Sequence, residues 1–477
     1  MGGVKFGTDG WRAVISEDYT FDNVKLVAQA VSDYVKEALT SSQEAKVKDK
    51  RFVIGYDTRF LSDKYAELVA CVMAANGIKV ILSDRPTPTP SVSFAITDKG
   101  LIGGVMITAS HNPARYNGIK YKAYFGGSAG PQITKKLEAG LGKNEPAFMD
   151  KKEAVAKGLI STEDIISKHL AFIRSYAKIA LLKKTRLKVL VDSMYGTGND
   201  YIAELLKDGK CKVDTIHNEK NPGFGGINPE PIMPNLKELA EKTKKGKYDL
   251  GIATDGDADR LGIALPNGKL LTGHKVMSLL LLHLLEDRSM TGGVVQTLCG
   301  TVLINKVCDK YGLKRYETPV GFKYICELML KEDILIGGEE TGGVAFKNSI
   351  PERDGVLSGL LMLEMMAMRK KKMLRILEDV DDEYGTFEYR RLDLRYPDDK
   401  KAKLMAYLRN NPLKEVLGKK VVDINRLDGE KFICEDLSWL MMRLSGTEPI
   451  LRVYAEASSE KKAFAILDFG KKLAEGM

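Results

Sequence analysis

Residues 108–113 of this 477-residue chain, TASHNP, carry side chains that could do covalent chemistry. They follow the apolar run 105–107, and an apolar run that stops in small and polar residues is typical of a buried strand entering a tight loop. We therefore expect Ser110 at the end of a rigid strand, with its hydroxyl facing a cleft. His111 and Lys120 are nearby in sequence, and a hydroxyl needs such a base because it is a weak nucleophile until its proton is taken. A serine in such a loop can also simply cap a turn.

Residues 254–260, TDGDADR, follow the apolar strand predicted at 248–253. Three carboxylates occupy alternate positions: Asp255, Asp257 and Asp259. Neighbouring carboxylates repel one another, so a positive group must offset them, and hard oxygen ligands favour Mg²⁺ or Ca²⁺. An EF-hand would need Gly and Glu where this chain has Arg260 and Pro266. The motif predicts a divalent cation site, with an exposed acidic turn as the alternative.

Two glycine-framed loops could bind a phosphorylated sugar. Residues 6–12 end in Arg12, whose planar guanidinium suits phosphate, although a plain N-terminal turn is the alternative. Residues 338–343, GEETGG, could exchange hydrogen bonds with sugar hydroxyls through Glu339 and Thr341, and they could also form a tight hairpin.

A third such loop lies near the C-terminus. Residues 443–449, RLSGTEP, and the following Arg452 combine backbone N–H groups, hydroxyls and two guanidinium groups. Such a turn is a plausible phosphate cradle.

The elements that must position these loops alternate between strands and helices. A helix over 21–39, a strand over 51–56, a helix over 64–76 and a strand over 78–82 precede the Ser110 strand, with 86–90 as a stiff connector. This order indicates βαβ units and a mainly parallel sheet. Similar α/β units follow, and after residue 379 short strands mix with helices in a smaller α+β domain.

A chain of this length predicts three or four domains. We place them at 1–160 with the Ser110 loop, 161–265 with the acidic motif, 266–384 with the GEETGG loop, and 385–477 with the C-terminal loop.

The composition is that of an ordinary globular protein, with 44% hydrophobic and 29% charged residues. The net charge of +9 is compatible with a cationic cleft for phosphorylated small molecules, and no basic arm interleaved with aromatics favours nucleic acid. The six cysteines form no CxxC pair and indicate a reduced, cytoplasmic protein. Charged residues near the N-terminus argue against a signal peptide. The Met- and Leu-rich residues 358–368 could form a membrane-surface helix, but a core helix is the commoner case.

Together, the loops at 108–113, 255–260, 338–343 and 443–449 resemble the α-D-phosphohexomutase superfamily, which includes phosphoglucomutase, phosphomannomutase and phosphoglucosamine mutase. They occur in the family's order and cover nearly the whole chain. The resemblance implies three related mixed α/β sandwich domains plus a C-terminal α+β domain around a central cleft.

The resemblance also implies a mechanism. Ser110 would be carried as phosphoserine, and one Mg²⁺ would be held by Asp255, Asp257, Asp259 and a phosphoserine oxygen. The phosphoryl group would pass to a hexose phosphate, and the hexose 1,6-bisphosphate would turn over and return the other one. Lys120 is the first candidate for the general acid/base, provided that its pKa is lowered, and His111 is its rival.

Other residues would bind the substrate. Arg12, Lys323 and Arg260 would neutralise the cleft, while Glu339 and Thr341 would hold sugar hydroxyls. The non-reacting phosphate would be held by the C-terminal loop: Arg443, Ser445, Gly446, Thr447 and Arg452.

The resemblance favours interconversion of glucose and mannose 1- and 6-phosphates by a monomer or homodimer, with phosphoglucosamine mutase as the alternative. Many relatives have Ser-Gly-His where this chain has residues 341–343, Thr-Gly-Gly, which weakens the sugar assignment. Two other classes stay open: a serine hydrolase using Ser110 and His111, and a binding protein without turnover. The hydrolase lacks a G-x-S-x-G elbow, and adjacent side chains at a strand end are expected to point apart.

Overall fold

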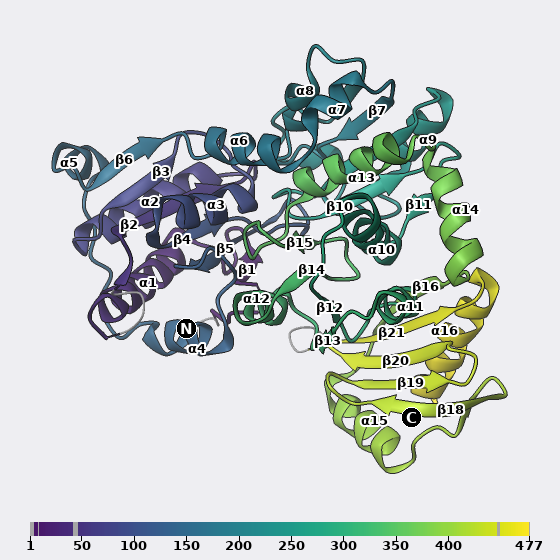
Figure 1. Ribbon diagram of the computed structural model, residues 1–477. Coiled ribbons are helices and arrows are strands. Elements are labelled where there is room, and N and C mark those ends of the chain that lie inside the picture. Colours follow the sequence, from purple (N-terminus) through teal and green to yellow (C-terminus); the bar gives the residue numbers. More distant parts are fainter. Residues whose placement is uncertain (1–3, 8, 42–45, 446–448, 477) are drawn as a thin grey trace.

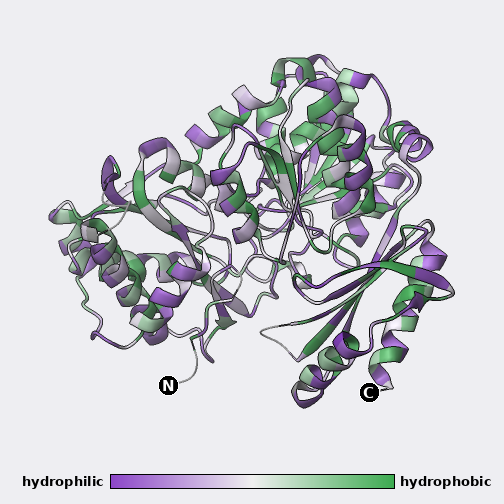
Figure 2. Cartoon of the chain, turned by 60° about the horizontal axis from the view of Figure 1, so that its bottom comes forward, coloured by the Kyte–Doolittle hydropathy of each residue, from purple (hydrophilic) through white to green (hydrophobic). Residues whose placement is uncertain are grey.

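The computed structural model describes residues 4–7, 9–41, 46–445 and 449–476. Four sheets follow one another along the chain, and the first and fourth lie at opposite ends of the molecule (Figure 1). Hydrophobic residues concentrate within the layers, while hydrophilic residues predominate on outer helices and loops (Figure 2). No helix in the described part of the chain is both long and apolar enough to cross a membrane.

The first sheet has six strands in the order β1(Trp11–Val14), β5(Tyr116–Ala123), β4(Leu101–Ile107), β2(Asp49–Tyr56), β3(Val80–Ser83) and β6(Ile160–Glu163). The strands β4, β2, β3 and β6 are parallel, whereas β5 runs antiparallel to β4 and to β1. Its helices are α1(Phe21–Ser41), α2(Ser62–Ala75), α3(Thr89–Lys99), α4(Pro131–Gly140) and α5(Lys151–Ala156). Phe52 and Val53 of β2 enter different apolar clusters, so this strand is buried on both faces.

The second sheet has the order β11(Leu270–Leu271), β10(Leu261–Ala264), β9(Leu250–Thr254), β7(Lys188–Asp192) and β8(Lys212–Ile216). The strands β7, β8 and β9 are parallel, and β10 turns back antiparallel to β9. The helices of this segment are α6(Ser167–Tyr176), α7(Ile179–Lys184), α8(Tyr201–Leu206) and α9(Lys237–Lys245), with a short 3-10 turn η2(Phe224–Gly226). The acidic motif therefore lies in the tight connection between β9 and β10.

The third sheet has the order β13(Arg315–Thr318), β12(Gly293–Thr297), β14(Ile334–Gly338) and β15(Val344–Phe346). The accompanying helices are α10(Gly273–Leu282), α11(Val302–Tyr311), α12(Phe322–Lys331), α13(Gly355–Arg369) and α14(Met373–Tyr384), with a π-turn η3(His283–Asp287) after α10. Helix α13 packs on the second sheet, where Gly359 faces Ile252 and Leu261. Its residues from Gly355 to Ala367 are buried, so it is a core helix and the membrane-surface alternative is wrong.

The fourth sheet is antiparallel throughout, in the order β16(Glu388–Arg395), β21(Ile450–Ala457), β20(Trp439–Leu444), β19(Glu430–Cys434), β18(Lys419–Asn425) and β17(Glu415–Val416). It packs with α15(Asp398–Asn410) and α16(Glu460–Glu475). The fold class expected from the sequence, α/β units followed by an α+β domain, is confirmed.

Several elements differ from the sequence prediction. Residues 86–90 are not only a connector, because α3 begins at Thr89, with Pro90 in the first turn where proline is tolerated. Strand β5, which carries Lys120, was not predicted. The first sheet extends through β6 to Glu163, and the second extends through β11 to Leu271. Both sheets thus reach a few residues past the predicted domain limits.

Candidate functional site

Ser110 and the acidic motif are in direct contact. Strand β4 is buried along its whole length, and the loop after it turns at Ser110, whose φ is 51°. The Ser110 hydroxyl donates to Asp255 Oδ2 at 3.0 Å. A Cβ on Gly256 would lie 2.6 Å from the Ser110 carbonyl oxygen, so only glycine permits this approach of the two loops. The structure thus joins two segments that lie 145 residues apart in sequence.

The three aspartates form a buried cluster. Asp255, Asp257 and Asp259 are each 0% exposed, and one oxygen from each lies within 4.8 Å of the others. One oxygen of Asp257 and one of Asp259 have no hydrogen-bond partner among the described residues. Burial, followed by repulsion from Asp259 and Asp257, raises the pKa of Asp255 well above its usual value. Orphaned hard oxygens in a charged cluster fit a divalent cation such as Mg²⁺.

Lys120 partly neutralises this cluster. Its Nζ lies 2.7 Å from Asp257 Oδ2, 3.1 Å from Asp259 Oδ2 and 2.9 Å from Asp9 Oδ2. Burial alone would lower the pKa of Lys120, but the three carboxylates outweigh burial and raise it. The lowered pKa that a neutral amine base would need is therefore not present, and Lys120 is an ammonium group in this arrangement.

His111, Arg12 and Arg260 lie around the same centre. Burial and the positive charges of Arg260, Arg12 and Lys120 lower the pKa of His111 well below its usual value, so its imidazole is neutral. Its Nδ1 is 3.4 Å from Ser110 Oγ. The expectation that these adjacent side chains point apart is therefore wrong, because the left-handed turn at Ser110 brings them to the limit of a hydrogen bond.

The two arginines reach the centre from different elements, Arg12 from β1 and Arg260 from the loop that precedes β10. Arg12 donates from Nη1 to Asn112 Oδ1 at 2.9 Å, and Arg12 pairs with Gly118 across the β1–β5 ladder, two residues from Lys120. The Nε of Arg260 lies 3.9 Å from Asp259 Oδ1. Together they give the cleft the positive charge that a phosphate group requires.

Arg353 connects the GEETGG loop to this centre. Its Nη2 lies 2.8 Å from Asp259 Oδ2 and 2.9 Å from Asp9 Oδ2, while its Nη1 lies 3.2 Å from Glu339 Oε2. Glu339 is 9% exposed. Burial raises the pKa of Glu339 to about 7, against the opposing effect of Arg353. Thr341 has a buried hydroxyl oxygen without a hydrogen-bond partner among the described residues, which leaves it available to a ligand.

Lys323 lies in the first turn of α12. Burial lowers its pKa, and the carboxylates of Glu327 and Asp9 act in the opposite direction. Asp9 is also an ion partner of Lys120 and Arg353.

The C-terminal loop is on the fourth sheet. Arg443 and Arg452 pair across the β20–β21 ladder. The Nε of Arg443 donates to Asp428 Oδ2 at 2.8 Å, and the Nε of Arg452 lies 3.8 Å from Asp393 Oδ2. The Ser445 amide donates to the Ile450 carbonyl at 3.0 Å, which closes the base of the loop. Gly446 and Thr447 lie outside the described residues.

Some residues of the centre were not predicted as site residues. Asp9 and Arg353 hold the loops together, and Thr89 donates to Asp257 Oδ2 at 2.5 Å. Lys122 and Glu352 form a second buried ion pair beside Asp9. The segment 351–354, PERD, directly before an apolar helix was the available signal for Glu352 and Arg353.

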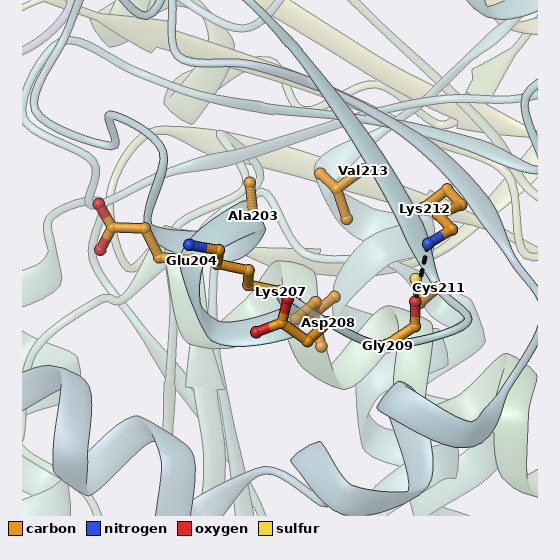
Figure 3. Close-up of a pocket in the computed structure, with 9 residues that line it drawn as sticks. Ala203, Glu204, Lys207, Asp208, Gly209, Cys211, Lys212 and Val213 are labelled. Carbon is orange, nitrogen blue, oxygen red and sulfur yellow. Dashed lines mark hydrogen bonds between the residues drawn. The ribbon is translucent and has the colours of Figure 1, made fainter.

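A surface hollow of about 340 Å³ beside α8 and β8 is not part of this centre (Figure 3). Its lining runs from α8 through the connection that follows it to the start of β8, whereas the acidic motif follows the end of the parallel strand β9. The hollow and the acidic motif therefore lie at opposite ends of the parallel strands of the second sheet. The side chains of Glu204, Lys207, Asp208 and Lys212 are spread along its rim (Figure 3) and do not converge on one point.

Comparison with known families gives four matches in chain order. Residues 3–147, 167–268 and 272–384 match the phosphoglucomutase/phosphomannomutase alpha/beta/alpha domains I, II and III, and residues 394–469 match the C-terminal domain of the same family.

Individual relatives cover the whole chain. A phosphoglucomutase/phosphomannomutase of Thermococcus kodakarensis is 31% identical, with 99% of each chain covered. A phosphoglucosamine/phosphogalactosamine mutase of Sulfurisphaera tokodaii is 30% identical over 99% of this chain and 100% of its own length. A crystal structure from Thermus thermophilus that carries a phosphomannomutase assignment superposes with a TM-score of 0.86 at 32% identity, covering 99% of each chain. Because all four domain families match in order and relatives of 30–31% identity cover 99% of its length, this chain belongs to the phosphoglucomutase/phosphomannomutase family, within the α-D-phosphohexomutase superfamily.

Proposed function

We propose that this chain interconverts the 1- and 6-phosphates of glucose and mannose through a phosphoserine at Ser110. As a member of its family the chain is a phosphohexomutase, an isomerase. The observation that supports the proposal most directly is the 3.0 Å contact between the Ser110 hydroxyl and Asp255, inside a buried cluster of acids and cations. This cluster has the groups that phosphoryl transfer needs, because such catalysis is mostly positioning and charge neutralisation.

One Mg²⁺ would be held by Asp255, Asp257 and Asp259, with an oxygen of phosphorylated Ser110 as a further ligand. The orphaned oxygens of Asp257 and Asp259 support this assignment. When bound, the ion would neutralise negative charge on the transferring phosphoryl group.

The side chains of the site would have separate roles in phosphoryl and proton transfer. In the first half-reaction the bond between phosphorus and Ser110 Oγ breaks, and a bond between phosphorus and a hydroxyl of the bound hexose phosphate forms. Lys120, as an ammonium group, would donate a proton to the departing Ser110 Oγ, and neutral His111 would accept the proton of the attacking hydroxyl. The second half-reaction reverses these roles after the bisphosphate has turned over in the cleft.

The substrate would be held at both ends. Glu339, Thr341 and Lys323 would orient the sugar hydroxyls in either direction. The four proposed domains would contribute one loop each, and the fourth would hold the non-reacting phosphate. Its proposed ligands are Arg443, Ser445, Gly446, Thr447 and Arg452.

Two full-length relatives support different sugar preferences. The full-length relative from Thermococcus kodakarensis supports glucose and mannose, while the relative from Sulfurisphaera tokodaii supports amino sugars as the alternative. We also propose a cytoplasmic location, since all six cysteines are free and buried, and a monomer or homodimer.

The test is a set of steady-state rates on glucose, mannose and glucosamine 1-phosphates, with Mg²⁺ and hexose 1,6-bisphosphate present. A higher kcat/KM for glucose and mannose phosphates than for glucosamine phosphate supports the proposal. A higher kcat/KM for glucosamine phosphate would replace it with phosphoglucosamine mutase. Binding of all three sugars without turnover by the phosphorylated protein would instead indicate a binding protein. Release of acid from ester substrates would indicate a hydrolase.

A further inference from the structure

The Ser110 loop has a backbone conformation that requires outside support. Ser110 lies in the left-handed region at φ 51°, which is disfavoured for a residue with a Cβ. The loop also turns four backbone carbonyl groups in one direction. They belong to Ser110, Asn112, Pro113 and Tyr116. Four converging carbonyl oxygens repel one another and need several donors at one place.

One side chain, Arg59, donates to all four of these carbonyl oxygens. Its Nη2 donates to the carbonyl oxygens of Ser110 and Asn112, both at 2.6 Å. Its Nη1 donates to those of Pro113 and Tyr116 at 2.9 and 3.0 Å. The side chain of Arg59 is 0% exposed, so water does not compete for these bonds.

The guanidinium group is itself fixed from two other sides. Its Nε lies 3.1 Å from Asp57 Oδ2 in an ion pair in which both side chains are 0% exposed. The other oxygen of Asp57 accepts from the Arg59 amide at 2.9 Å and from the Ser62 hydroxyl at 2.7 Å. The ring of Phe224, from the second sheet's segment, lies 4.9 Å from the guanidinium carbon.

This arrangement excludes a role for Arg59 in binding substrate. A guanidinium group has five N–H donors and no acceptor. Four of the five donate to loop carbonyls. The fifth, on Nε, is buried in the ion pair with Asp57 and has no hydrogen-bond partner among the described residues, so no N–H of this side chain is exposed to a phosphate or a sugar. Arg12 and Arg260 differ, because each faces the carboxylates of the cleft.

We infer that Arg59 is a positioning residue for phosphoryl transfer: it fixes the Ser110 loop so that Oγ points at the reacting centre. This inference rests on the proposed function of Ser110. Lysine is a poor substitute, because its three donors lie at one point and cannot span two pairs of carbonyls as a planar fork does. The loss should therefore appear in the chemical step and not in substrate binding.

The test is Arg59→Lys, assayed for conversion of glucose 1-phosphate to glucose 6-phosphate with Mg²⁺ and hexose 1,6-bisphosphate. We expect kcat to fall about 100-fold, since a misplacement of about 1 Å costs that much, while KM stays within about threefold because uniform binding is retained. The matched control is Arg51→Lys in β2, the strand that precedes the loop carrying Arg59. Arg51 pairs with Asp49 and Glu163 at the other end of β2, and its substitution should leave kcat and KM unchanged.

The possible outcomes distinguish failure of the positioning role of Arg59 from failure of the proposed mutase function. If Arg59→Lys keeps the wild-type kcat, or changes KM alone, the positioning role is overturned while the mutase function stands. If wild-type protein neither interconverts the sugar phosphates nor carries phosphoserine, the proposed function fails and this inference fails with it.

If Arg59→Lys does not fold, Asp57→Asn serves as the test, because it keeps the guanidinium group but loosens its orientation. A wild-type kcat in a folded Asp57→Asn protein would then overturn the positioning role, and a selective fall in kcat would support it.

Discussion

Glu339→Gln should stabilise the protein above pH 7 and have little effect on stability near pH 4.5. Burial raises the pKa of Glu339 from its ordinary 4.5 to about 7. At 1.36 kcal/mol per unit, the ionised form costs about 3 kcal/mol of unfolding free energy. Glu339 is 9% exposed, so solvent screening reduces this figure little. Glutamine resembles the neutral acid and avoids the cost.

The direction in which the stability difference changes with pH follows from proton binding. Between pH 4.5 and about 7 the folded Glu339 holds a proton that the unfolded chain has already released. Stability of the wild type therefore falls through this window relative to the variant. The difference between the two proteins isolates this one group, because all other titrating residues are shared.

The assay is urea unfolding of both proteins in metal-free buffer at pH 5, 6, 7 and 8. The variant's advantage should grow with pH and level off at about 3 kcal/mol. A difference that does not change with pH, or one that shrinks as pH rises, would refute the assignment of a raised pKa. The same variant should lose activity, since Glu339 is proposed to bind the sugar.

Three further outcomes are expected. Arg288→Met should cost about 3–5 kcal/mol of unfolding free energy, because it removes the guanidinium group whose Nη2 lies 2.6 Å from the buried Glu364 carboxylate and leaves only His283 as an ion partner; adding Glu364→Gln should recover much of the loss in urea unfolding, and no recovery would contradict this. Thr89→Val should raise the Mg²⁺ Kd by about 10- to 100-fold in calorimetry, because it removes the hydrogen bond to Asp257; an unchanged Kd would show that this bond does not orient the ligand. EDTA should stop turnover and added Mg²⁺ should restore it, whereas full activity in EDTA would count against the metal assignment.

The apolar strands of the fold were readable from the sequence, and some others were not. Strands β4 and β9 were predicted because each is a short apolar run before a polar loop. Strand β5 was missed because its buried residues include Asn117, Lys120 and Lys122. The two lysines face the charged centre and Asn117 bonds to Ser62, and these polar residues hide the strand pattern. Functional residues thus obscured the secondary structure that carries them.

The loops of the centre were predicted, but not the residues that join them. Ser110 and the three aspartates are recognisable as local motifs. Arg353 is not, because its role depends on contact with Asp9, which lies 344 residues away in sequence. Arg59 was likewise not singled out from the sequence, since the four carbonyls that it holds become visible only in three dimensions.

The most direct test of the account is a single-turnover experiment on the protein phosphorylated by ³²P-labelled hexose 1,6-bisphosphate. The account predicts label on Ser110 alone, and transfer of that label to added glucose 1-phosphate when Mg²⁺ is present. Label on another residue, or label on Ser110 that no hexose phosphate can remove, would contradict it.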